Sequence, residues 1–274
     1  MGNGIAHSLA VGGYRVTLID ASEQALSNGH ETIGANLQRA VERGKLAASE
    51  AGEAAARIAL GRSIADAAAA QLVVEAVPEQ MTVKHAVFRA LQTVCAAHAV
   101  FATNTSALSI TEIAAGVDDP ARVIGMHYFN PAHVMRLVEV VRGLETSDRA
   151  VSLVCEVAAR SGKETVIINE APGFATSRIN ALIGNEAFYM LMEGVASARD
   201  IDRALKLGLN HPMGPFEMID LVGLDTRLHV LEYLHATLGE KFRPCPLLVK
   251  YVKAGRLGRK VGRGVYDYPE RARP

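Results

Sequence analysis

Apolar positions in the first 170 residues follow two alternating patterns. Short runs rich in β-branched residues predict strands at 14–19, 72–77, 100–103, 123–126, 137–141 and 165–168. Between them, apolar side chains recur every three or four residues, which predicts helices at 4–10, 22–43, 47–56, 84–96, 109–115 and 150–161. Strands that alternate with helices at this spacing are typical of crossover units, so we expect an α/β fold with a mostly parallel sheet.

The pattern changes after Pro172 and Gly173. Beyond this point the apolar spacing is helical, with predicted helices at 177–193, 198–207, 215–222, 225–238 and 246–254. We therefore place a domain boundary near 169–173, with an α/β domain at 1–170 and an all-α domain at 171–274. A chain of 274 residues is long enough to bury two such cores.

Charge and composition narrow the class of protein. Lysine plus arginine and aspartate plus glutamate number 29 each, a balance that argues against a nucleic-acid or membrane-surface partner. No apolar run reaches the roughly 18 residues that span a bilayer, and no signal-peptide pattern opens the chain. Because Cys95, Cys155 and Cys245 lie far apart, we expect no metal site, no disulfide framework and a cytoplasmic location.

The first 20 residues carry the later part of a Rossmann-like dinucleotide-binding pattern, in which a glycine-rich turn opens a helix and the next strand ends in an acid. Gly2 precedes Asp20 by 18 residues, which suits the third motif glycine and the acid that binds ribose hydroxyls. Each residue also has an ordinary explanation, as a helix-start glycine and as a strand-end cap. If Asp20 does bind ribose, it favours NAD over NADP, because a carboxylate repels a 2′-phosphate.

The two earlier motif glycines and the strand before them are absent from the sequence. In the doubly wound order this strand lies at the middle of the sheet, so we expect two central strand edges without a partner. Our hypothesis is that translation starts upstream of Met1. The alternative is that the chain is made as written, and in that case we expect weak NAD binding and low stability.

A histidine and a glutamate on successive strand-like runs suggest acid–base chemistry. His127 follows the run at 123–126, at the carboxyl edge of a parallel sheet, where ligands bind. Glu139 lies in the next run and can reach the imidazole from an adjacent strand. A histidine oriented by a carboxylate can take a proton from a hydroxyl, although a histidine near a strand end is more often structural.

Long motifs along most of the chain carry a family resemblance. They are VVEAVPE at 73–79, NTSALSIT at 104–111, GMHYFNP at 125–131, LVEVV at 137–141, APGF at 171–174 and GLNHPMGPFEMIDLVGLD at 208–225. With these motifs the sequence resembles the 3-hydroxyacyl-CoA dehydrogenase family, and its bacterial 3-hydroxybutyryl-CoA type in particular. The resemblance implies NAD-dependent oxidation of an (S)-3-hydroxyacyl-CoA to a 3-oxoacyl-CoA, in fatty-acid oxidation or a related short-chain route.

The resemblance also implies roles for individual residues. His127 would be the general base, and Glu139 would stabilise its charged form. Ser106 would hydrogen-bond the substrate oxygen near the nicotinamide. Asp20 would hold the adenosine ribose. The other positions that match the family's cofactor site are Gly2, Glu79, Lys84, Asn130 and Lys260.

One position departs from the family pattern P-G-F-x-x-N-R. Here Ser177 stands in place of the asparagine that contacts the substrate, so the pose of the substrate and the turnover are in doubt. Lys45 is a candidate contact for the phosphates of CoA, but a solvated helix face is the simpler explanation of its charge. The resemblance implies that the helical domain helps to bind the substrate and forms a homodimer.

Two other functions stay open at this point. One is a dehydrogenase of the same fold that acts on another hydroxy acid, such as a sugar acid. The other is a non-catalytic, crystallin-like protein, which the short beginning and Ser177 would suit. Activity with acetoacetyl-CoA against activity with a free sugar acid would separate the two dehydrogenases, and the absence of NAD binding in a well-folded dimer would favour the non-catalytic protein.

Overall fold

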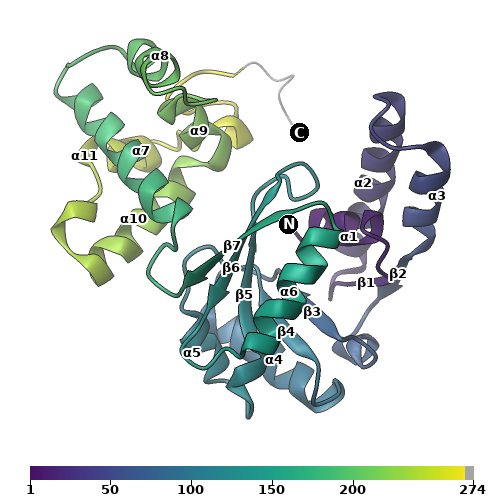
Figure 1. The fold of residues 1–274 in the computed structure, drawn as a ribbon. Coiled ribbons are helices and arrows are strands. Elements are labelled where there is room, and N and C mark those ends of the chain that lie inside the picture. The colour runs from purple at the N-terminus through teal and green to yellow at the C-terminus, as the bar shows by residue number, and fades with distance from the viewer. Residues whose placement is uncertain (269–274) are drawn as a thin grey trace. The chain divides into compact units, whose positions relative to one another are not determined.

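The computed structural model describes residues 1–268 and divides the chain into two compact units, with the boundary between Glu170 and Ala171. Among these described residues, all the strands belong to the first unit, and the second is helical (Figure 1). The predicted Rossmann-like fold with a helical C-terminal part is confirmed. Four short 3₁₀ helices connect the main elements: η1 (Ile64–Ala67), η2 (Pro120–Arg122), η3 (Glu240–Phe242) and η4 (Arg259–Val261).

The main sheet has five strands in chain order. They are β3 (Leu72–Glu75), β4 (Val100–Thr103), β5 (Val123–Tyr128), β6 (Leu137–Arg142) and β7 (Glu164–Asn169). Every pair is parallel except β5–β6, which is antiparallel. The reason is the short connection between these two strands, since a parallel return needs a crossover of a dozen or more residues. His127 thus lies within β5, near its end, and not after the strand as the sequence suggested.

Helices cover both faces of this sheet. They are α4 (Met81–Val94), α5 (Ile110–Ala114) and α6 (Asp148–Arg160). The Ser109 hydroxyl accepts from the Glu112 N–H at 3.0 Å, so the predicted capping serine does begin α5. On one face, Val151, Val154 and Val157 of α6 pack in one cluster with alternate strand residues. On the other, the rings of Phe88 and Phe101 meet edge to face.

A second, smaller sheet lies beside the first (Figure 1). It consists of β1 (Val16–Ile19) and β2 (Ile58–Gly61), which are parallel and accompany α1 (Gly2–Val11), α2 (Glu23–Glu42) and α3 (Ala48–Ala56). These helices share a core of their own, formed by Ala6, Ala10, Ile33, Leu37 and Ala54. The sequence did not predict β2, because its four residues are Ile-Ala-Leu-Gly and only the glycine is buried.

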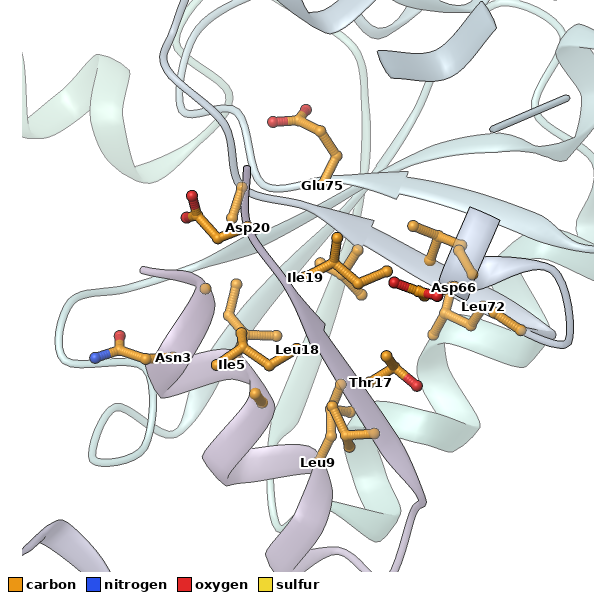
Figure 2. A pocket seen from close by; sticks show the side chains of 18 of the residues that line it. Asn3, Ile5, Leu9, Thr17, Leu18, Ile19, Asp20, Asp66, Leu72 and Glu75 are labelled. Atoms are coloured by element: carbon orange, nitrogen blue, oxygen red, sulfur yellow. The ribbon is translucent and has the colours of Figure 1, made fainter. Parts of the chain in front are cut away.

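A cavity of about 1880 Å³ separates the two sheets, and the residues of both β1 and β3 line it. Figure 2 shows Leu18 and Ile19 on one side of it and Leu72 on the other. Within residues 1–268, β1 pairs only with β2, and β3 pairs only with β4. The two strand edges that face the cavity therefore have no partner strand, as the sequence predicts.

The part of the second unit that the structure describes, residues 171–268, contains five α-helices. They are α7 (Thr176–Met192), α8 (Ala198–Gly208), α9 (Pro215–Val222), α10 (Leu224–Leu238) and α11 (Pro246–Lys253). Phe188, Phe216 and Phe242 are fully buried in its core. Buried Asp220 accepts hydrogen bonds from the N–H groups of Val265 and Tyr266, which ties the segment after η4 to α9.

Two negative findings concern the described residues. Among residues 1–268, no helix combines the length and the apolar character needed to cross a membrane. The same residues hold no cluster of three or more histidine, cysteine or acidic side chains in a metal-binding arrangement. Cys95, Cys155 and Cys245 are free thiols.

Candidate active site

His127 and Glu139 face each other across the antiparallel pair of β5 and β6. They are register partners, so their side chains emerge on the same face of the sheet. His127 Nδ1 lies 2.7 Å from Glu139 Oε2, and both side chains are buried. A buried carboxylate at this distance fixes the ring orientation and favours the tautomer with a proton on Nδ1. In that tautomer Nε2 is the basic nitrogen.

Ser106 lies at this basic nitrogen. Its hydroxyl oxygen is 3.1 Å from His127 Nε2. The segment that carries Ser106 directly follows β4, so the serine reaches the histidine from the neighbouring strand. Asn104, at the start of the same segment, accepts a hydrogen bond from the Tyr128 N–H at 2.8 Å and holds the end of β5. The structure thus brings together His127, Glu139 and Ser106, to which the family resemblance assigned the base, its carboxylate partner and a hydrogen bond to the substrate oxygen.

The carboxylate of Glu79 holds the backbone of Ser106 in place. Glu79 Oε1 accepts from the Ser106 N–H at 3.0 Å and from the Thr105 hydroxyl. Glu79 Oε2 lies 3.2 Å from the Lys84 ammonium, which is 1% exposed. Lys84 also donates to both oxygens of Glu75, at 2.9 and 3.0 Å. Of these residues, Glu75 was not singled out from the sequence, although an acid inside an apolar strand signals a buried partner.

The residues predicted for the adenosine end of the cofactor lie around α1 and β1. Asp20 is exposed directly after β1, and its Oδ1 accepts from the Ser22 N–H at 2.9 Å. Figure 2 shows Asp20 with Asn3, at the start of α1, and Glu75 toward one end of the cavity. At Gly2 the nearest atom to an added Cβ is that of Ala76, at 3.8 Å, so packing does not require glycine there.

This arrangement fits a dinucleotide. Asp20 offers a carboxylate to ribose hydroxyls, and the N-terminus of α1 favours a negatively charged diphosphate. Asn130 is exposed just beyond β5, at the end of the strand near which His127 lies. The residues of the first unit that are predicted to bind the cofactor therefore lie along the ends of the strands, from β1 to β5.

The three remaining predicted residues are Lys45, Ser177 and Lys260. Lys45 is exposed in the turn between α2 and α3. Ser177 is the second residue of α7, and Lys260 lies in η4, where it forms an ion pair with Asp225 at 2.6 Å. Ser177 and Lys260 belong to the second unit, and their part in the site stays a prediction.

A mostly parallel sheet with a dinucleotide site and a histidine–carboxylate pair is typical of the class of nicotinamide-dependent dehydrogenases. Comparison with known families specifies the class further. Residues 1–171 match the NAD-binding domain of 3-hydroxyacyl-CoA dehydrogenase, and residues 173–268 match its C-terminal domain. The chain therefore belongs to the 3-hydroxyacyl-CoA dehydrogenase family. The predicted family is confirmed, and the protein is an NAD-dependent oxidoreductase.

Relatives similar to the whole chain carry consistent names. The probable 3-hydroxybutyryl-CoA dehydrogenase of Bacillus subtilis is 46% identical over 99% of this chain and 95% of its own length. The 3-hydroxyadipyl-CoA dehydrogenase of Escherichia coli is 42% identical over 98% of this chain and 57% of its own. The crystal structure of (S)-3-hydroxybutyryl-CoA dehydrogenase from Ralstonia eutropha superposes with a TM-score of 0.95, at 41% identity, over 98% of this chain and 96% of that one.

Proposed function

We propose that this protein oxidises short-chain (S)-3-hydroxyacyl-CoA, such as 3-hydroxybutyryl-CoA, to 3-oxoacyl-CoA, with His127 as the general base. The single observation that carries the proposal is the contiguous series Ser106 Oγ, His127 Nε2, His127 Nδ1 and Glu139 Oε2, joined at 3.1 and 2.7 Å. A base held on one side by a buried carboxylate, and facing a hydroxyl on the other, is the geometry needed to take a proton from an alcohol.

The chain's own residues account for the movement of the proton. When bound, NAD accepts a hydride from C3 of the substrate. As the 3-hydroxyl is oxidised, His127 Nε2 takes its proton, and the imidazolium forms 2.7 Å from the Glu139 carboxylate. Because both side chains are buried, this ion pair is stronger than it would be in water. Ser106 donates a hydrogen bond to the same substrate oxygen and holds it at Nε2.

The substrate end of the proposal rests on two further residues. We assign the CoA phosphates to the exposed Lys45 and the acyl group to the neighbourhood of Ser177. A serine has a shorter reach than asparagine and offers no amide, so we expect a weaker substrate contact at Ser177 than a family asparagine provides. On the cofactor side, Lys260 is assigned to the nicotinamide end. The relatives named 3-hydroxybutyryl-CoA dehydrogenase support a short acyl chain.

Oxidation of NADH by acetoacetyl-CoA tests this function. We expect the protein to reduce acetoacetyl-CoA with NADH. In the opposite direction, with NAD, we expect it not to oxidise a free sugar acid. His127→Asn should abolish turnover while the variant still binds NADH, as measured by quenching or transfer of NADH fluorescence. A folded protein that binds NADH but reduces no acyl-CoA would overturn the proposal and favour a non-catalytic role.

We also propose that the helical unit forms a homodimer. It exposes large apolar side chains, among them Leu207 at 75%, Leu209 at 65% and Ile179 at 58%. The mass in solution, measured by light scattering, should be twice that of the chain and should fall to one chain in Leu207→Glu if this surface is the interface. The three free thiols support a reducing, cytoplasmic location for the protein.

A further inference from the structure

A small polar pocket lies against the second half of α1. Its volume is about 150 Å³, and the segment 131–136 after β5 and the turn 161–163 before β7 form its other walls. The polar side chains that line it are those of His7, Ser8, His133, Arg136, Ser161 and Lys163. None of the described residues that line this pocket also lines the cavity between the two sheets or belongs to the His127 group. The pocket is therefore separate from the residues assigned to NAD and to proton transfer.

Two histidines meet in this pocket. The ring centroids of His7 and His133 lie 5.0 Å apart, and the ring planes are inclined by 31°. His7 is 7% exposed, and its buried Nδ1 has no hydrogen-bond partner among residues 1–268. A buried polar atom without a partner is rare in folded proteins, and one explanation is an ion or a water molecule that completes the site.

Lys163 and Arg136 add permanent positive charge. The Lys163 ammonium is buried and donates to the carbonyl oxygens of Ala132 and Met135 at 2.7 and 2.8 Å. Because an ammonium has three N–H donors, one of them remains beyond these two bonds. Arg136 lines the exposed side of the pocket, where its guanidinium lies 2.5 Å from the Glu164 carboxylate. The pocket thus holds donors of both the buried and the exposed kind.

No acidic side chain is among the described residues that line the pocket. Burial lowers the pKa of His7 to about 4, and the charges of His133 and Lys163 lower it further. Burial also lowers the pKa of His133, as do the charges of Lys163 and of Arg39 on α2. A proton on either ring therefore meets positive charge without a nearby counter-charge, and an anion in the pocket would reverse this effect.

We propose that this pocket binds a small tetrahedral oxyanion, such as sulfate or a phosphate group, and that His7 takes up a proton when the anion binds. The volume of the pocket corresponds to roughly five water molecules, which suits an ion of five heavy atoms. Ammonium, guanidinium and imidazolium N–H groups form strong, charge-assisted hydrogen bonds with such oxygens. Because the anion supplies the missing counter-charge, it binds more tightly at low pH.

A sulfate titration tests the site, because sulfate does not change its charge near neutral pH. The signals of isotope-labelled histidine side chains are followed by NMR at constant ionic strength, with chloride as the replaced salt. We expect the His7 and His133 signals to shift saturably with sulfate. Saturating sulfate should raise the pKa of His7 by about 1, so sulfate should bind the protonated form about tenfold more tightly. The exposed His98 is the internal control, and its signal should not respond.

Three substitutions separate a specific site from a general salt effect. His133→Gln removes one ring and should weaken sulfate binding about tenfold, as measured from the His7 signal. Arg136→Gln should weaken it by about threefold. Glu164→Gln, the matched control, removes the acid beside Arg136 and should strengthen it. Sulfate also stabilises proteins without binding to a site. The proposal is therefore wrong if His7 shows no saturable response, or if His133→Gln responds as the wild type does.

Acetoacetyl-CoA distinguishes the two sources of the anion. If a phosphate group of CoA occupies the pocket, acetoacetyl-CoA should displace sulfate, and His133→Gln should raise the KM for acetoacetyl-CoA. If the pocket takes a free anion, acetoacetyl-CoA should leave the His7 signal unchanged. Either result supports the site and identifies its ligand. The sulfate titration needs only the folded chain, so an inactive protein would refute the proposed function and leave this inference standing.

Discussion

The two sheets of the first unit differ in how completely their strands are paired. In the five-stranded sheet, β4, β5 and β6 each have a partner on both sides, and β4 and β5 are entirely buried. In the two-stranded sheet, β1 has a single partner and contains no fully buried residue. The residues proposed for proton transfer lie on the first sheet, and Asp20 lies on the second. We therefore expect chemistry to depend on a rigid part of the molecule, and NAD affinity on a more easily opened one.

The largest expected effect concerns the rigid sheet. Glu139→Gln keeps the shape of the side chain but cannot stabilise an imidazolium, and it can hold the ring in the wrong tautomer. We expect kcat for acetoacetyl-CoA reduction to fall by about 10²- to 10⁴-fold with KM for NADH nearly unchanged. Glu164→Gln on the neighbouring strand β7, where the glutamate is exposed, is the control and should be active. A fall of less than about tenfold in Glu139→Gln would contradict the assigned role.

Hydrogen exchange compares the two sheets directly. Because β1 contains no fully buried residue whereas β4 is entirely buried, the amides of β1 should open without unfolding of the five-stranded sheet. We expect the amides of Val100–Thr103 in β4 to exchange about a thousand-fold more slowly than those of Val16–Ile19 in β1. Mass spectrometry of peptides from the two strands measures this ratio. Equal protection would show that the two sheets open as one cooperative body.

A contact between His7 and His133 joins helix α1 to the segment after β5, and it makes the packing of these two segments sensitive to pH. His7 of α1 is 7% exposed, its ring centroid lies 5.0 Å from that of His133, and burial lowers its pKa to about 4. The nearby charges of His133 and Lys163 lower this pKa further. His133, the partner ring, follows β5 and is itself only partly buried.

The sign of the pH effect follows from the two states. The unfolded chain binds a proton at His7 near pH 6.5, whereas the folded chain binds one only near pH 4. The contribution of His7 to the free energy of unfolding is therefore fully present above pH 6.5 and is lost as the pH falls toward 4. The loss is on the order of 3 kcal/mol. His7→Phe should weaken the dependence of the melting temperature on pH over this window. An unchanged slope in that variant would rule out His7 as its source.

The smallest expected effect concerns the two-stranded sheet. Asp20→Ala removes a carboxylate that is exposed and is assigned to the ribose, so we expect KM for NADH to rise about tenfold while kcat stays within about twofold of wild type. Steady-state kinetics at saturating acetoacetyl-CoA measures both constants. A fall in kcat without a change in KM for NADH would show that Asp20 does not act in binding the ribose. It would also remove the functional contrast between the two sheets.

Local patterns determined most of the elements and the chemistry of this protein. The periodicity of apolar positions gave β4 and α9 with the bounds that the structure has, and the capping serine of α5 was evident from its spacing to Glu112. The motifs around His127 and Glu139 indicated the family, and the spacing of Gly2 and Asp20 indicated the dinucleotide site. These features can be read from the sequence because each depends on residues close together in the chain or on a residue type with a specific chemistry.

Only the tertiary structure decided which distant residues meet. The strand β2 forms because its backbone pairs with β1 and not because of its own residues, so no local pattern indicates it. The antiparallel register sets Glu139 opposite His127, where the sequence only placed them on successive strands. The sequence matched Lys84 to the family's cofactor site but did not show that it is buried between Glu75 and Glu79, because contacts with carboxylates of other segments, which make a buried ammonium stable, form only in the fold.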